Sequence, residues 1–260
     1  MAVVLGIDAA WTARHASGVA VVAGEAGQWR LVTVADSYAD FYRQAGLDGL
    51  EAGFDAGQLL EAAAVVAENR VDLIAADIPL AHSPIVGRRE SDNAVSRLYG
   101  GRHAGTHTPS VERPGALADR MRADFMAEGY PLLVAAPAVR GLIEVYPHPA
   151  LIELATAPQR LRYKVGKIGT YWKALPVVER RDRLLAEWRS IVALLDRRIA
   201  GSAALLPLPD AGAPVRVLKA YEDMLDAVVC GWIGSCVLEG KAMALGDADS
   251  AIWVPVLPAV

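Results

Sequence analysis

The chain begins with three short apolar runs that are separated by turns. Val3–Ile7, Gly18–Ala23 and Trp29–Ala35 each have the length and the aliphatic, β-branched character of a strand. A polar turn joins the first two runs, and the segment Gly24–Gly27 joins the second to the third. Connections this short join antiparallel neighbours, so the pattern predicts three antiparallel strands at the start of the fold.

Helical and strand patterns alternate next. Tyr38–Gly53 fits either a short helix or a loop, whereas Asp55–Arg70 has apolar residues at helical spacing and an aspartate that can cap the helix. Val71–Asp77 is then a second buried strand that ends in an aspartate. A helix between two strands of one sheet implies a right-handed crossover. The strand before Asp77 should therefore run parallel to the strand before Asp8.

The rest of the chain predicts an interrupted α/β domain. Residues 81–140 are rich in Gly, Pro, Arg and His, and predict an insertion with helical pieces near Glu90–Leu98 and Ala116–Met126. The later expected elements are a strand, two long helices and a final edge strand that tolerates proline: Gly141–Tyr146, Pro176–Ala200, Leu218–Leu238 and Ile252–Pro255. We expect one domain over residues 1–260, with the first insertion at about 81–140 and a helical insertion at about 150–214.

Composition favours a soluble globular protein. The chain has 260 residues, of which 53% are hydrophobic and 22% are charged, enough for a sizeable core. It has no basic leader at the N-terminus and no run of about 18 uncharged apolar residues. We therefore expect a cytoplasmic protein without a membrane span. Cys230 and Cys236 lie six residues apart on a predicted helix, too far for a disulfide.

Charge is distributed unevenly along the chain. The formal net charge of −4 is unlike that of a dedicated nucleic-acid binder, which is usually basic. Residues 159–183, however, contain eight Lys or Arg against Glu179 and Asp182, which leaves +6 in that window. The window is either a phosphate-binding surface or a solvated face.

Two aspartates directly follow strands that we expect to be parallel. If these strands are adjacent, Asp8 and Asp77 lie at the same edge of the sheet, about 4.8 Å apart laterally. Open α/β sheets bind ligands beyond the carboxyl ends of their strands. Two carboxylates so close repel each other unless a proton or a cation lies between them. The alternative is that Asp8 only caps the turn into the second strand.

A second pair of acids lies on the last predicted helix. Asp223 and Asp226 are three residues apart and therefore share one face of the helix. Asp226 stands between Leu225 and Ala227, near the expected core boundary, where acids are uncommon. Carboxylate oxygens that converge from separate elements are the ligands of Mg²⁺ or Mn²⁺ sites.

Together these motifs resemble a known fold. Gly6-Ile-Asp8, a hairpin, Asp77-Ile-Pro and a helical Asp223-x-x-Asp226-Ala are similar to the RNase H-like fold, and the helical motif is similar to that of RuvC-type junction resolvases. More specifically, the chain resembles a family of predicted RNase H-like nucleases catalogued as a domain of unknown function. The matching features span nearly the whole chain: Asp77-Ile-Pro79-Leu, Arg88-Arg89-x-x-Asp92 with Arg97, Glu144-Val-Tyr-Pro147, Tyr163-Lys164 and Leu225-Asp226-Ala227.

The resemblance implies a fold and a chemistry. The fold is an RNase H-like mixed sheet of five strands, three antiparallel and then parallel ones, with helices on both faces and a helical or loop insertion. The chemistry is two-metal hydrolysis of a phosphodiester with Mg²⁺ or Mn²⁺. Asp8 would bridge the metal ions, Asp77 and Asp226 would each hold one, and Glu144 or Asp223 would complete the set. Glu144 could instead form an ion pair with an insertion arginine, and Asp223 could be a solvated helix residue.

Basic residues supply candidate substrate contacts. Arg88, Arg89 and Lys164 could contact phosphate, or pair with surface acids instead. His148, just beyond the strand that carries Glu144, could assist proton transfer. The expected partner is a nucleic acid or a nucleotide, and DNA, RNA, a branched junction and a small nucleotide all fit.

Two other functions fit the same core. An actin-like or sugar-kinase-like phosphotransferase also places an aspartate after its first strand, to hold Mg-ATP, but it needs a second domain with its own phosphate hairpin, for which the sequence gives no sign. A non-catalytic nucleic-acid-binding module that retains the acids is the other alternative.

Overall fold

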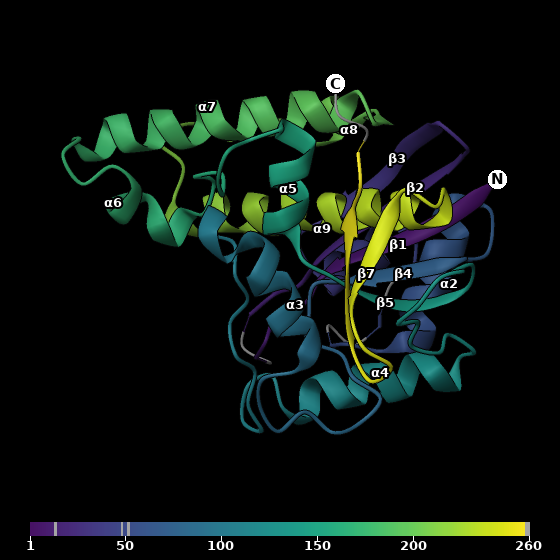
Figure 1. Cartoon of the computed structure of the whole chain (residues 1–260). Coiled ribbons are helices and arrows are strands. Elements are labelled where there is room, and N and C mark those ends of the chain that lie inside the picture. Colours follow the sequence, from purple (N-terminus) through teal and green to yellow (C-terminus); the bar gives the residue numbers. More distant parts are fainter. Residues whose placement is uncertain (13–14, 48, 51–52, 258–260) are drawn as a thin grey trace.

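The computed structural model describes residues 1–12, 15–47, 49–50 and 53–257. Its strands are β1 (Ala2–Asp8), β2 (Gly18–Glu25), β3 (Gln28–Ala35), β4 (Leu73–Ala76), β5 (Gly141–Val145), β6 (Ile199–Ala200), β7 (Ala242–Gly246) and β8 (Ala251–Pro255). Within the described residues they form one mixed sheet of eight strands in the order β6-β3-β2-β1-β4-β5-β8-β7 (Figure 1).

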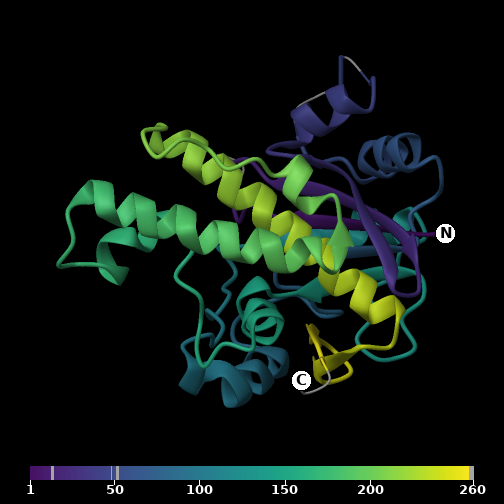
Figure 2. The ribbon, with the colours of Figure 1, turned by 90° about the horizontal axis from the view of Figure 1, so that it is seen from above.

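Helices cover both faces of this sheet. They are α1 (Tyr38–Gln44), α2 (Ala56–Ala67), α3 (Glu90–Tyr99), α4 (Ala116–Ala127), α5 (Pro147–Ala155), α6 (Ile168–Tyr171), α7 (Val177–Asp196), α8 (Ser202–Leu205) and α9 (Val215–Leu238), with 3₁₀ turns η1 (Gly100–Arg102) and η2 (Val165–Lys167). Figure 1 shows α7 and α9 above the sheet and α4 below it, and Figure 2 shows α7 and α9 from their own side.

Each face of the sheet has its own hydrophobic core. Along β1, Val4 points into the core under α5, α7 and α9, whereas Val3 and Leu5 point into the core formed with α1, α2 and α4. Successive side chains of a strand face opposite sides, so a strand buried on both faces is apolar throughout. This explains the continuous apolar run of the first strand.

Several local predictions are confirmed. The β1, β2 and β3 strands are antiparallel, and β1 pairs with β4 in parallel. The Asp55 side chain accepts a hydrogen bond from the Gln58 N–H at the start of α2, as expected for its cap. The two helices expected within residues 81–140 are present as α3 and α4.

The expectation of five strands was wrong, because the described residues form eight. The short β6 and the strand β7 were not predicted. The segment Ile252–Pro255 was expected at an edge, but β8 lies between β5 and β7. Its Pro255 is tolerated because it ends the strand, opposite Ala242. The fully buried pattern of β8 is that of an interior strand.

The structure also bears on the two cysteines and on membrane-spanning helices. Cys230 and Cys236 both lie in α9 and are unpaired, as their spacing predicted. Among the described residues, no helix combines the length and the apolar character that crossing a membrane would require.

Glycines bring α9 unusually close to the sheet. A side-chain Cβ at Gly6 would overlap the Ala227 carbonyl oxygen and the Gly231 nitrogen, and a Cβ at Gly18 would overlap the Asp223 carbonyl oxygen. The backbone of α9 therefore rests directly on β1 and β2 at the ends of these strands that lie near Asp8 and Gly18. This contact fixes where the acids of α9 stand relative to the sheet.

We expect Gly6→Ala to destabilise the protein by about 1–3 kcal/mol, because the added methyl group must push α9 away from β1. Gly100→Ala is the matched control, since Gly100 has helical backbone angles and an added Cβ there would meet no other atom within 4 Å. Urea unfolding of both variants measures the difference. Equal stability of Gly6→Ala and wild type would show that the helix is not seated this tightly.

Candidate active site

Acidic residues from three elements meet at the carboxyl end of the sheet. Asp8 ends β1 and Asp77 follows β4, and these parallel strands are paired with Ile7 opposite Ala76. The Asp77 N–H donates a hydrogen bond to the Ile7 carbonyl at 2.8 Å, which continues the pairing to the aspartates. Asp8 and Asp77 thus lie side by side at the same edge of the sheet, as the sequence predicted.

The α9 helix supplies the remaining acids. Asp8 is paired across the sheet with Gly18, and the backbone of Asp223 lies against that same glycine. Asp226 follows one turn later and is fully buried. The structure therefore brings Asp8, Asp77, Asp223 and Asp226 together, although they are distant in the sequence.

Burial and mutual repulsion act on these carboxyl groups. Burial raises the pKa of Asp8 well above its usual range, and the nearby Asp226 and Asp77 raise it further. Burial also raises the pKa of Asp77 to about 7, again with Asp226 contributing. Burial raises the pKa of Asp223 as well, while Lys219 opposes the shift. Acids in this state gain from any cation placed between them.

Two lysines and a tyrosine contact the acids of α9. Lys164 forms an ion pair with Asp226, and its Nζ lies 3.5 Å from Glu222 Oε1. Tyr163 donates a hydrogen bond from its hydroxyl to Asp226 Oδ1 at 2.8 Å. Lys219 pairs with Asp223 and with Glu222.

The sequence interpretation missed three of these residues. Tyr163, Lys219 and Glu222 were not among the expected site residues. Glu222 carried a usable signal, since it precedes Asp226 by four residues and so shares its helix face. The roles of Tyr163 and Lys219 depend on contacts that sequence spacing does not reveal.

The donor set fits a divalent cation by its chemistry. Carboxylate oxygens are the ligands that Mg²⁺ and Mn²⁺ prefer, and a cation would relieve the repulsion between Asp8 and Asp77. Within the described ranges, however, no group of three or more His, Cys, Asp or Glu is arranged as a ready metal site. Both Asp226 oxygens already accept a hydrogen bond, from Tyr163 and from Lys164. Asp8 and Asp77 are therefore the first ligands that a cation would meet.

Glu144 has a different environment. Arg89 donates to both of its oxygens, at 2.5 and 2.8 Å, and also to Asp92 Oδ1 at 3.0 Å. The Leu80 N–H donates to Glu144 as well. Arg89, Asp92 and Glu144 are all buried. Glu144 thus forms the ion pair with an insertion arginine that was the alternative to a catalytic role, and Arg89 is engaged in the same pair.

Arg88 and His148 also have defined partners. The exposed Arg88 donates to Asn93 Oδ1 at 2.8 Å and to Ser96 Oγ at 2.6 Å, so it packs on α3. His148 is buried in α5, and its ring lies edge-on to the Tyr163 ring, with the centroids 5.4 Å apart. Burial lowers the pKa of His148 well below its usual range, and Lys164 lowers it further, so the imidazole is neutral at pH 7.

The basic window extends from the site through η2 and α6 into α7. Lys164, near its start, reaches the acids directly. Arg180 and Arg181 donate to backbone carbonyls, those of Leu175 and Ala211, and so hold loops together. Only part of the positive charge of the window is thus available to a ligand.

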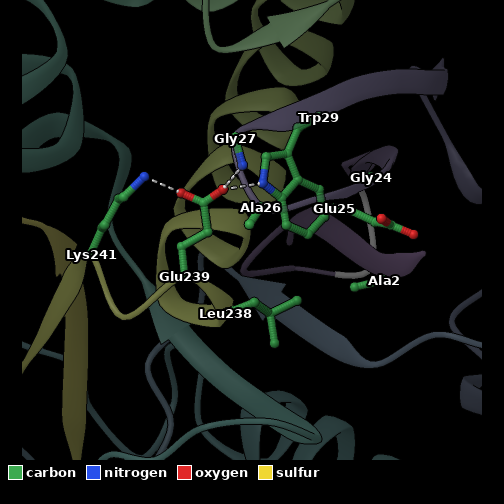
Figure 3. Close-up of a pocket in the computed structure, with 9 residues that line it drawn as sticks. All are labelled: Ala2, Gly24, Glu25, Ala26, Gly27, Trp29, Leu238, Glu239 and Lys241. Atoms are coloured by element: carbon green, nitrogen blue, oxygen red, sulfur yellow. Dashed lines mark hydrogen bonds and ion pairs between the residues drawn. The ribbon is translucent and has the colours of Figure 1, made fainter.

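Two hollows differ in their relation to the acids. One of about 520 Å³ lies at the other end of β1, beside Ala2, and there Glu239 accepts hydrogen bonds from the Gly27 N–H and the Trp29 indole and pairs with Lys241 (Figure 3). The Glu239 carboxylate therefore links the end of α9 to the β2–β3 hairpin. A smaller hollow of about 40 Å³ lies beside Asp77, and its lining includes Trp11.

The raised pKa of Asp77 predicts a pH effect on stability. Its folded pKa of about 7 lies above the ordinary value near 3.9, so folding favours the protonated form. That stabilisation is full below about pH 4 and is lost as the pH rises through 7, with a slope of at most about 1.4 kcal/mol per pH unit for one proton. Asp77→Asn should flatten this fall in EDTA.

Unfolding of wild type and Asp77→Asn by urea at pH 5, 6, 7 and 8 measures the two slopes. Asp182→Asn, a change of an exposed acid of α7, is the control and should keep the wild-type slope. Parallel curves for wild type and Asp77→Asn would mean that Asp77 has an ordinary pKa.

Comparison with known proteins identifies a family. The chain matches the family described as Protein of unknown function (DUF429) over residues 6–250, and it belongs to that family. The match includes all the acids of the cluster. No curated protein and no solved structure matches the chain. The sequence predicted a family catalogued as a domain of unknown function, and the match confirms membership of such a family.

Proposed function

We propose that this member of the DUF429 family is a metal-dependent nuclease with an RNase H-like core. The observation that carries the proposal is the meeting of Asp8 at the end of β1, Asp77 just after β4 and Asp226 in α9, at the carboxyl edge of the sheet. The strand order β3-β2-β1-β4-β5, antiparallel and then parallel, supports the RNase H-like assignment, because the resemblance in the sequence implies this arrangement.

The residues of the chain divide into two roles. Asp8 and Asp77, which are partly exposed, would hold Mg²⁺ or Mn²⁺. Divalent cations in such a site activate a water molecule and stabilise the leaving oxygen of a phosphodiester. Tyr163 fixes the orientation of Asp226 by its hydrogen bond. Lys164, whose side chain is 20% exposed, carries a positive charge to the same place and would meet the phosphate.

A cleavage assay tests this function. Purified protein is incubated with Mn²⁺ or Mg²⁺ and with single-stranded DNA, duplex DNA, RNA and a four-way junction, each with an EDTA control. Cleavage of at least one substrate that depends on the metal supports the proposal. Cleavage of none of them, or cleavage that persists in EDTA, contradicts it. Thermal stabilisation by Mg-ATP without any cleavage would favour a phosphotransferase instead.

A further inference from the structure

Lys164 stands at the most deeply buried acid of the cluster. Its ammonium group pairs with Asp226, lies 3.5 Å from Glu222 Oε1 and lies 5.0 Å from the centroid of the Tyr163 ring. Asp226 is fully buried, and its other oxygen accepts the Tyr163 hydroxyl. The positive charge next to Asp226 is thus supplied by the protein itself.

The backbone on both sides of Lys164 is anchored. The Trp188 indole donates to the Tyr163 carbonyl at 2.9 Å, and the Val165 N–H donates to Glu222. Tyr163 and Val165 are themselves buried. Lys164 is therefore held in its position by the fold and is not a mobile surface lysine that happens to meet an acid.

Lys219 provides a contrast within the same cluster. It also pairs with acids of α9, Asp223 and Glu222, but its side chain is 50% exposed, against 20% for Lys164. The exposed Lys219 pairs are screened by solvent and contribute little, so the loss of Lys219 is not expected to create a second metal site. A cation that is to reach Asp226 must instead expel Lys164 from among buried groups.

We propose that Lys164 takes the place of one of the two metal ions, so that the site would hold a single divalent cation, with Asp8 and Asp77 as its ligands. This inference rests on the proposed function, because it concerns the same site and the same chemistry. Lys164 balances the charge of Asp226 where a second metal ion would otherwise be needed, and its side chain remains 20% exposed to a substrate phosphate. Asp8 and Asp77 are partly exposed and are therefore open to a cation from solvent.

The test is a count of bound metal ions. Metal-free protein is titrated with Mn²⁺ in a calorimeter, and free Mn²⁺ is measured in parallel by electron paramagnetic resonance. We expect one ion per chain for wild type. Lys164→Met should bind two, because Asp226 becomes available, whereas Lys164→Arg retains the charge and should bind one. Lys219→Met is the matched control and should also bind one.

The possible outcomes separate the inference from the proposed function. Two ions in wild type, or one ion in a folded Lys164→Met, would overturn the role of Lys164 and leave the nuclease proposal standing. No ion in any variant would overturn the nuclease proposal itself. If Lys164→Met does not fold, the number of ions bound by wild type still tests the inference, since two ions would overturn it. Anomalous scattering from crystals soaked in Mn²⁺ then provides a second measurement, with one peak expected beside Asp8 and Asp77 and none beside Asp226.

Discussion

Asp8→Asn is expected to reduce phosphodiester cleavage by a factor on the order of 10³ without unfolding the protein. Asp226, Asp77 and Asp223 all lie close enough to Asp8 to raise its pKa. The carboxylate of Asp8 is therefore the central ligand of the proposed site. Loss of a metal ligand removes several kcal/mol of transition-state stabilisation, and about 4 kcal/mol corresponds to a factor of about 10³ in rate.

The same variant should melt at or above the wild-type temperature in EDTA. Burial and neighbouring acids raise the pKa of Asp8, which means that its charged form is unfavourable in the folded protein. A neutral asparagine relieves that cost. Initial rates at saturating Mn²⁺ and thermal melts in EDTA give both quantities, with Asp182→Asn as the control. A variant that retains more than about a tenth of the wild-type rate would exclude Asp8 as a metal ligand.

Arg89→Met is expected to destabilise the fold by about 3–5 kcal/mol, because it leaves Glu144 and Asp92 buried without a cation. The control is Arg97→Met in α3, the helix that begins directly after Arg89. It breaks an ion pair with Glu90 in which the arginine side chain is 63% exposed. Exposed pairs contribute at most about 1 kcal/mol, so the control should lose little. Urea unfolding at pH 7 measures both changes.

A second replacement distinguishes an unpaired charge from simple loss of packing. Glu144→Gln in the Arg89→Met background removes one of the two stranded carboxylates and should recover part of the stability. If the double variant is as unstable as Arg89→Met alone, the arginine stabilises the fold by packing rather than by charge.

The predictions that succeeded depend on neighbours in the sequence. A run of β-branched residues predicts the first strand, Asp55 predicts the cap of α2, and an aspartate after each of two parallel strands predicts that Asp8 and Asp77 lie together. Each of these rests on spacing within a few residues, or on the handedness rule for a single crossover.

The predictions that failed depend on long-range pairing. Whether Ile252–Pro255 is an edge strand is decided by β7, which covers it, and that pairing cannot be read from either segment alone. The contacts of Lys164 with Asp226 and of Arg89 with Glu144 join residues 62 and 55 positions apart. The sequence identified both basic residues and offered an ion pair of Glu144 with an insertion arginine as an alternative, but only the packed structure shows that this arginine is Arg89 and that Lys164 pairs with Asp226.

The close contact of α9 with the sheet means that the position of the acids is set by the helix itself and not by the connections that lead into it. Gly6 and Gly18 fix the helix at Gly231 and Asp223. A residue added to the loop before α9, at residues 206–214, would change only the conformation of that loop and leave the site intact. One residue added between Asp226 and Gly231 would turn the acid by about 100° around the helix axis. Differences in length among members of the family should therefore be aligned from these glycines, with gaps placed outside the helix.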